Sequence, residues 1–273
     1  MAICNKLKKS RAAYYKAVNA DKILLEEYKL LKSKVLYYRS FMTELGSKKL
    51  YHLINPDLIE NNIEIGRDKF IEFLRKEDLL VPKRKPRYRI TTDSNHPFKV
   101  YKNLTQELKV TKPDQLWVSD ITYLRTEKGF CYLALITDAY SRKIVGYDVS
   151  DTLELEGALN ALKMAERNKI GQETIHHSDR GSQYCSYAYT DRLKRDSTKI
   201  SMAAAGNCYE NAMAERVNGI LKMEFHLDYT FKNTQQAKLI AKQSIAIYNQ
   251  MRPHWGINLK TPEEMYNLKR KSA

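Results

Sequence analysis

The first 81 residues place hydrophobic side chains at the three- and four-residue spacing of amphipathic helices. One apolar stripe runs through residues 21–45 and predicts a long helix. Two shorter stripes, Ser47–Ile54 and Arg67–Lys76, flank a break at Ile65 and Gly66. Two short helices joined by a tight turn suit a helix-turn-helix, although a plain helical hairpin fits the pattern too.

Residues 115–150 change to the apolar runs and alternation of strands. Three strands with short turns at 127–129 and 140–142 are expected, which favours an antiparallel meander. Helices and strands then alternate, so the pattern predicts an α/β domain. The elements expected after the meander are a helix with apolar residues from Leu153 to Ala165, a strand ending near His177, a helix over Ser182–Arg195, a short strand over Lys199–Ala203, a helix that contains Glu215 and a long helix over Thr234–Met251.

Basic residues are concentrated ahead of this α/β domain. The chain of 273 residues has a formal net charge of +15, and residues 1–112 hold 25 Lys and Arg against 13 Asp and Glu. Such an uneven surplus favours a module that binds a polyanion such as DNA, although a basic solubilising region is an alternative. The candidate DNA contacts in the helical region are Lys48, Lys49, Arg67 and Lys69.

A basic run punctuated by prolines begins at residue 82. Proline resists helix formation, so we expect an extended linker over 82–114, between a helical region 1–81 and the α/β domain 115–273. Arg84 and Lys85 in this run are candidate phosphate contacts, and a solvated linker that touches nothing is an equal alternative.

The cysteines and apolar runs bear on the compartment. Cys4, Cys131, Cys185 and Cys208 form no Cys-X-X-Cys pair, and reduced thiols are the default for such a chain in the cytosol. The longest apolar run, Phe130–Ile136, is too short to cross a bilayer. We therefore expect a cytoplasmic protein with no membrane partner.

Three acidic residues stand out in the α/β domain. Asp120 lies within an apolar strand, Asp179 lies at a strand end that runs into a Gly/Ser turn, and Glu215 lies in the opening turns of a helix. A carboxylate in a buried strand is costly unless it is paired or binds a metal. If the three carboxylates converge, divalent cations must offset their repulsion, and an all-oxygen site suits Mg²⁺ or Mn²⁺. Two such ions clamp the attacking and leaving oxygens of a phosphoryl transfer.

The contexts of the three acids resemble a known signature. Trp-Val-Ser-Asp-Ile-Thr-Tyr surrounds Asp120, His-Ser-Asp-Arg-Gly-Ser-Gln-Tyr surrounds Asp179, and Asn-Cys-Tyr-Glu-Asn-Ala-Met-Ala-Glu ends at Glu215, with 35 residues between the last two acids. This order, these flanks and this interval resemble the D,D(35)E signature of retroviral-integrase-like transposases. The chain is most similar to OrfB, the second-frame product of the insertion-sequence family with two overlapping frames, the IS-three family.

The resemblance implies a fold, an activity and partners. It implies a ribonuclease H-like (integrase) catalytic domain with a mixed sheet, preceded by the helix-turn-helix-like region. The implied enzyme is a DDE-type transposase that uses Asp120, Asp179 and Glu215 to hold Mg²⁺ or Mn²⁺, with two ions expected, for strand cleavage and strand transfer at the ends of the element. Its implied partners are the element ends and target DNA, the first-frame product OrfA or a fusion to it, and further copies of the chain in the active complex, in the prokaryotic cytoplasm at the nucleoid.

Further residues are candidates for lesser roles. His177 lies on the same side of an extended segment as Asp179 and is a candidate to orient it, with an ordinary polar contact as an equal alternative. Gly181 would allow close backbone approach to a ligand. Lys222 lies two helical turns after Glu215 and is a DNA-binding candidate, with a solvated lysine as the alternative. Asp138, near a strand end, is expected to form a turn.

Arg252 and His254 are candidate DNA contacts near the end of the last long helix, and helix termination explains them equally well. Two other functions remain open on the sequence: a DNA-binding regulator or end-binding subunit without catalysis that needs the first-frame partner, and a nuclease that only hydrolyses. Joined DNA products distinguish both from a transposase.

Overall fold

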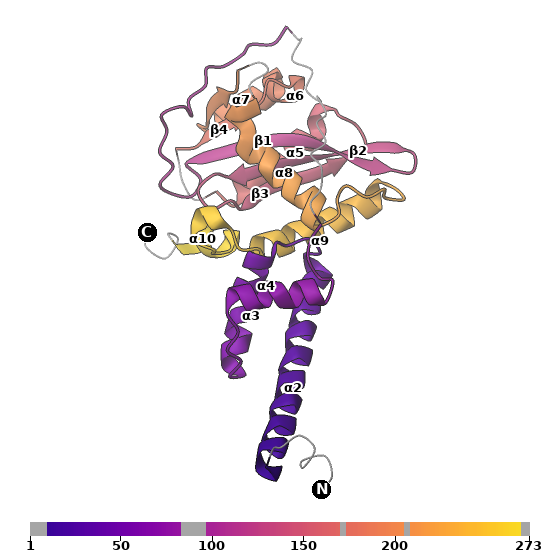
Figure 1. The fold of residues 1–273 in the computed structure, drawn as a ribbon. Helices are drawn as coiled ribbons and strands as arrows, with labels where there is room; N and C mark the ends of the chain where they lie inside the picture. The colour runs from indigo at the N-terminus through magenta and orange to yellow at the C-terminus, as the bar shows by residue number, and fades with distance from the viewer. Residues whose placement is uncertain (1–9, 83–96, 170–172, 205–207, 269–273) are drawn as a thin grey trace. The chain divides into compact units, whose positions relative to one another are not determined.

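The computed structural model describes residues 10–82, 97–169, 173–204 and 208–268, and the chain divides into two compact units, Met1–Pro82 and Lys83–Ala273. Within the described residues, no helix combines the length and hydrophobicity that crossing a bilayer requires. Figure 1 shows the elements of each unit.

The described part of the first unit, residues 10–82, contains three helices around an apolar core. The helices are α2 (Arg11–Phe41), α3 (Ser47–Glu60) and α4 (Arg67–Lys76). Ser10 caps α2 by accepting a hydrogen bond from the Ala13 backbone N–H at 3.1 Å. The helix expected over 21–45 thus begins ten residues earlier, at Arg11, and ends at Phe41, four residues before the expected end. The fully buried core side chains include Leu31, Val35, Leu50, Ile54, Phe70 and Leu74.

Helix α3 continues past the point where the sequence predicted its end. Pro56 lies inside the helix, although the expected element stopped at Ile54. A proline removes one backbone donor and strains the preceding turn, so it usually ends a helix. Here Leu58 is buried in the next turn, and Asp57 accepts a hydrogen bond from the Lys34 ammonium at 2.9 Å. Tertiary contacts of the residues that follow the proline therefore stabilise the extra turn.

The second unit is organised on a five-stranded mixed sheet. Its strands are β1 (Leu116–Thr126), β2 (Gly129–Asp138), β3 (Ile144–Ser150), β4 (Ile175–Ser178) and β5 (Lys199–Met202). The order is β3-β2-β1-β4-β5; β1, β2 and β3 pair antiparallel, whereas β4 and β5 run parallel to β1. This is the ribonuclease H-like order, and the predicted fold class is confirmed.

Helices cover both faces of the sheet (Figure 1). They are α5 (Leu155–Arg167), α6 (Ser182–Cys185), α7 (Tyr187–Arg195), α8 (Ala212–Glu224), α9 (Thr234–Met251) and α10 (Pro262–Leu268), with short 3₁₀ turns η1 (Cys208–Asn211) and η2 (Trp255–Ile257). Alternate residues of β1 face opposite sides, so Trp117 packs in the cluster that includes α5, whereas Leu116 and Val118 pack with Ala214 of α8.

The helix expected over Ser182–Arg195 is two helices instead of one. Ser186 ends α6 with an extended backbone, and its hydroxyl accepts a hydrogen bond from the Tyr189 N–H at 3.3 Å to cap α7. A serine side chain competes for local backbone donors and therefore starts helices better than it continues them. Periodicity alone did not detect this break, because the apolar stripe passes through it.

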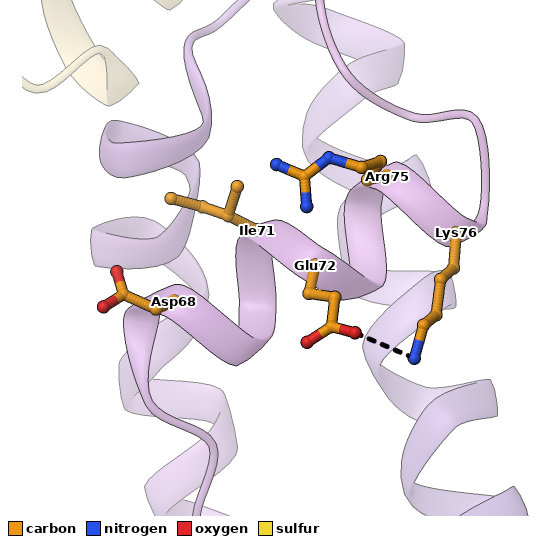
Figure 2. Close-up of a pocket in the computed structure, with 5 residues that line it drawn as sticks. All are labelled: Asp68, Ile71, Glu72, Arg75 and Lys76. Carbon is orange, nitrogen blue, oxygen red and sulfur yellow. Dashed lines mark ion pairs between the residues drawn. The ribbon is translucent and has the colours of Figure 1, made fainter.

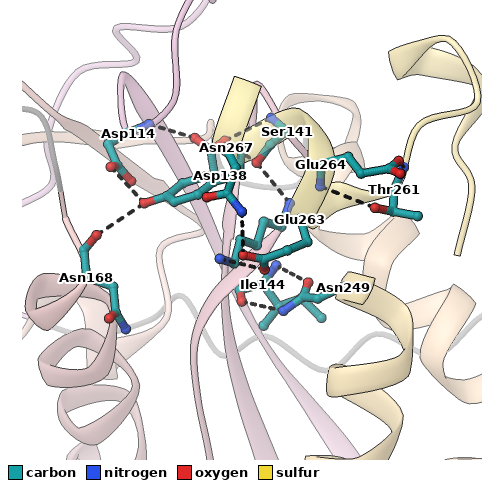
Figure 3. Close-up of polar contacts among 12 residues, drawn as sticks. Asp114, Asp138, Ser141, Ile144, Asn168, Asn249, Thr261, Glu263, Glu264 and Asn267 are labelled. Atoms are coloured by element: carbon teal, nitrogen blue, oxygen red, sulfur yellow. Dashed lines mark hydrogen bonds and ion pairs between the residues drawn. The ribbon is translucent and has the colours of Figure 1, made fainter. Parts of the chain in front are cut away.

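A polar network joins the C-terminal helices to the sheet (Figure 3). Asp138 accepts hydrogen bonds from the N–H and hydroxyl of Ser141 and from the N–H of Asp114, so it forms the expected turn. Asn249 of α9 donates to the carbonyl of Ile144 at 3.0 Å and accepts from its N–H at 2.9 Å. Because β3 is an edge strand, this side-chain amide substitutes for a neighbouring strand.

Replacing Asn249 with alanine removes the partner of both backbone groups of Ile144, which lie in a buried setting. We expect Asn249→Ala to lower the free energy of unfolding by about 2–4 kcal/mol, the cost of two unsatisfied buried groups. Urea unfolding followed by circular dichroism measures this. The adjacent, exposed Gln250 supplies the control: Gln250→Ala should change stability little, and equal effects of the two substitutions would contradict this account of the edge strand.

Candidate active site

The register of two parallel strands brings two of the three acids side by side. Val118 of β1 pairs with His177 of β4. Asp120 lies two residues after Val118, and Asp179 lies two residues after His177. Because parallel strands end at the same edge of a sheet, this register places both carboxylates at neighbouring positions.

Hydrogen bonds orient the two aspartates. One oxygen of Asp120 accepts from the Ile121 N–H at 2.9 Å and the other accepts from the amide of Asn218 at 2.7 Å. Oδ1 of Asp179 accepts from the N–H of Gly181 at 3.0 Å. A Cβ on Gly181 would lie 3.2 Å from that same oxygen, a tight contact, so glycine leaves room for the carboxylate.

Glu215 approaches from the helix that covers this face of the sheet. It lies in the first turn of α8, and its neighbour Ala214 is buried against β1. The negative charge of Glu215 acts on the Asp120 carboxyl, as does that of Asp179. The structure therefore sets Asp120 beside Asp179 through strand register, and Glu215 acts on Asp120 through its charge, as the smallest of the causes that shift the Asp120 pKa.

The Asp120 carboxyl is poorly suited to carry a charge in the protein alone. Burial raises its pKa to about 7, and the negative charge of Asp179 adds to this. The hydrogen bonds from Asn218 and the Ile121 N–H lower the pKa, but they do not offset burial and repulsion. A divalent cation beside these oxygens would stabilise the ionised form.

The donor chemistry fits a hard cation, because carboxylate oxygens are the ligands that Mg²⁺ and Mn²⁺ prefer. Among the described residues, however, no three His, Cys, Asp or Glu side chains gather closely enough to form a ready-made metal cage. Asp120 and Asp179 are adjacent through strand register, so the placement of Glu215 on α8 decides whether the set can close around an ion.

The site includes two asparagines that the sequence analysis did not identify. Asn218 is buried on α8, and its Oδ1 has no hydrogen-bond partner while its amide nitrogen holds Asp120. Asn211 donates to the Ser119 carbonyl at 3.1 Å, and its Oδ1 is likewise buried without a partner. The spacing contained a signal for Asn218, because residues three apart share a helix face and it follows Glu215 by three.

His177 has a different set of contacts from the one that would orient Asp179. Its Nδ1 lies 2.8 Å from the Ser201 hydroxyl, and its Nε2 lies 3.1 Å from the Glu210 carbonyl. Both ring nitrogens are engaged in these bonds, so the ring acts on the segment ahead of α8 instead of on the aspartate.

The candidate DNA contacts differ in their exposure. Lys48 and Lys69 are exposed on α3 and α4, and Arg67 is exposed but pairs with Asp68 at 3.0 Å. Lys49 and Lys222 are half-buried. Arg84 and Lys85 fall outside the described residues.

The outer side of α4 mixes both signs of charge (Figure 2). A hollow there is lined by Asp68, Ile71, Glu72, Arg75 and Lys76, with Lys76 and Glu72 paired at 3.1 Å. The two acidic residues offset the two basic ones, so this side of α4 has little net positive charge.

Arg252 has a structural role. It is 1% exposed and forms a bidentate pair with Glu224, with nitrogen–oxygen distances of 2.6 and 2.7 Å. Of the two readings open for this residue, the structure supports the one that ends and anchors the long helix, because its guanidinium is not available to DNA.

Comparison with known proteins identifies relatives along the chain. Models of the integrase core domain match residues 110–208 and 196–262. The insertion element IS600 uncharacterized 31 kDa protein of Shigella sonnei is 39% identical over 258 residues, which cover 92% of this chain and 93% of that protein. The transposase for IS629 of Shigella sonnei is 38% identical, over 59% of this chain and 55% of that protein. Transposase InsF for IS3A of Escherichia coli K12 is 37% identical, over 63% and 61%.

Solved structures with some likeness are integrases of retroviruses. The HTLV-2 integrase catalytic core domain in complex with magnesium is 17% identical, with a TM-score of 0.46, and the match covers 58% of this chain and 99% of that one. The simian T-cell lymphotropic virus intasome is 15% identical, with a TM-score of 0.49, and covers 85% and 74%. The sequence relatives, and not these likenesses, carry the family assignment.

The raised pKa of Asp120 makes a prediction about stability without metal. The folded chain keeps this proton up to about pH 7, whereas the unfolded chain loses it near the ordinary value of 3.8, so stability falls as pH rises between those values. At pH 8 in EDTA, Asp120→Asn should therefore raise the free energy of unfolding by roughly 1–3 kcal/mol. At pH 5 the gain should shrink. The exposed Asp191 provides the control substitution, Asp191→Asn, and a loss of stability for Asp120→Asn at pH 8 would contradict the assignment.

Proposed function

Because the chain belongs to the insertion-sequence transposases of the IS3 family, we propose that it cuts DNA at the ends of an insertion element and joins the freed ends to another strand. The observation that carries the proposal is the strand register that sets Asp120 beside Asp179. Burial and the negative charge of Asp179 raise the pKa of Asp120, and Glu215 adds a smaller effect from α8. Carboxylates that are buried close together destabilise the fold through repulsion and loss of hydration. A bound cation would offset this cost.

Asp120, Asp179 and Glu215 hold the metal in this proposal. Two bound divalent cations would supply Lewis acidity toward the attacking and leaving oxygens of the phosphodiester. The Asn218 amide orients the Asp120 carboxylate, and the Gly181 N–H orients that of Asp179. No serine, tyrosine or cysteine needs to act as a nucleophile.

We assign the remaining regions to DNA and partners. The helical region 1–81 reads the element ends as a helix-turn-helix, the stretch 82–114 connects it to the catalytic domain 115–273, and exposed lysines such as Lys48 and Lys69 contact phosphates. Two ends must be brought together, so several copies act in one complex. The first-frame product OrfA, or a fusion to it, completes the recognition of the ends.

The test uses a plasmid that carries the gene within its own flanking DNA, so that the unknown ends are present. With the upstream frame supplied, junction PCR should detect joined ends with the intact chain. Asp179→Asn and Glu215→Gln should lower junctions by at least about 10³-fold, because each removes a charge needed to hold the ions.

Lys69→Gln is the matched comparison outside the carboxylate set. It should weaken binding of the ends and lower the dependence of that binding on salt, so the defect is largest at low salt, while leaving some joining. Equal junction yields with and without the carboxylates would contradict the catalytic assignment. End binding without any junctions in the intact chain would favour the non-catalytic, end-binding alternative, and cut but unjoined ends would indicate a nuclease.

A further inference from the structure

A hydrogen-bonded junction holds the chain just ahead of α8. Glu210 lies in η1, directly before that helix. One oxygen of its carboxylate, Oε2, accepts from the Ala204 N–H at 2.7 Å and from the side-chain amide of Asn103 at 2.8 Å. Ala204 follows β5, and Asn103 lies about a hundred positions earlier in the chain. A single carboxylate thus joins a residue that follows β5 and a segment distant in sequence to the start of the helix that contains Glu215.

A second connection reaches the Glu210 backbone through His177. The Glu210 carbonyl can only accept, so the His177 Nε2–H donates to it at 3.1 Å. Burial lowers the pKa of His177 and keeps the ring neutral, so its Nδ1 accepts from the Ser201 hydroxyl at 2.8 Å. The Ser201 oxygen in turn accepts from the Leu104 N–H at 2.8 Å. The donor and the acceptor of each of these hydrogen bonds are therefore defined.

Asn103 is itself held in one orientation. Its Oδ1 accepts from both the N–H and the hydroxyl of Thr105, at 2.8 and 2.7 Å, so the amide nitrogen faces Glu210. The segment around it is anchored, because Phe98 and Tyr101 pack on one core cluster and Leu108 and Val110 pack on the other. This segment is therefore held by the core, and its hydrogen bond to Glu210 restrains the start of α8.

We propose that Glu210 is a positioning residue, which sets the start of α8 and thereby the placement of Glu215, and that it is not a metal ligand. The proposal rests on the transposase function proposed above. Glu215 follows Glu210 by only five residues, in the first turn of the helix. A misplacement of a reacting group by about 1 Å is enough to lower a rate roughly 100-fold, so small shifts at Glu210 matter.

The state of the Glu210 carboxyl agrees with this role. Its pKa is lowered, first by the hydrogen bond from the Ala204 N–H and further by those from Asn103 and Gln106. The carboxylate is thus stabilised as an anion by donors of the protein. Asp120 differs, because its pKa is raised and only a cation would relieve it.

The experiment compares Glu210→Ala, Glu210→Gln and Asn103→Ala in the intact chain. Joining should fall roughly 10- to 100-fold in Glu210→Ala, with a higher Mg²⁺ concentration for half-maximal activity. Glu210→Gln should stay within about threefold of the parent, because its amide oxygen still accepts from Ala204 or Asn103. Asn103→Ala should lower joining in the same direction, and Asn103→Ala with Glu210→Ala should be no worse than Glu210→Ala, since both break one junction.

Binding of Mn²⁺, measured by electron paramagnetic resonance, gives a readout without catalysis. Glu210→Ala should weaken Mn²⁺ binding several-fold, whereas Glu210→Gln should bind nearly as the parent does. Glu107→Ala, which removes an exposed acid from the same anchored segment, is the control for charge and should change neither readout. Unfolding midpoints of all variants identify any that fail to fold, and the glutamine variant then decides.

The outcomes separate this proposal from the function on which it rests. If the parent chain joins no ends, the transposase function fails, while the Mn²⁺ comparison still tests the junction. If the parent joins ends and Glu210→Ala equals it in both readouts, positioning is wrong and the function stands. A glutamine variant as defective as the alanine variant would identify Glu210 as a metal ligand and overturn the proposal.

Discussion

Parallel pairing of β4 with β1 is the constraint on which the site depends. The match of Val118 to His177 places Asp120 and Asp179 at neighbouring strand positions, where their charges repel in a partly buried setting. Burial and this repulsion raise the pKa of Asp120 to about 7. The register thus places two carboxylates where a proposed cation would offset their repulsion, and without a cation that repulsion is an electrostatic cost to the fold. A one-residue slip in this register would turn one aspartate to the other face and abolish the pair.

The third carboxylate is placed by helix packing and by contacts distant in sequence. Ala214 and Val217 bury α8 against the sheet, while the Glu210 junction ties its start to β5 and to the anchored segment around Asn103. The bond from Asn103 spans more than 100 positions and the bond from Ala204 depends on the fold of the loop after β5, so neither is visible in a local pattern. The chain ahead of β1, expected as a linker on its prolines and charge, thus contributes packing and hydrogen bonds to the α/β domain from Phe98 onward.

Local pattern predicted the elements well and their interruptions poorly. The three-strand meander and the following α/β alternation were predicted, because strand periodicity is a local property. The convergence of all three acids stays a prediction, although strand register sets Asp120 beside Asp179. The turn through Pro56 and the break at Ser186 were missed, since tertiary burial decides the first and a cap decides the second. Asn218 and Glu210 escaped notice because their roles depend on which distant groups the fold brings to them.

The most direct test of the central claim is the titration of the Asp120 carboxyl carbon by NMR, without metal and then with saturating Mg²⁺. Without metal, the resonance should titrate near pH 7. With Mg²⁺, the pKa should fall by at least about two units, because a bound cation favours the ionised carboxylate. Asp179→Asn should lower the metal-free pKa and weaken the response to Mg²⁺. A titration near the ordinary value of 3.8 in the metal-free protein, or one that Mg²⁺ leaves unchanged, would contradict a shared cation site.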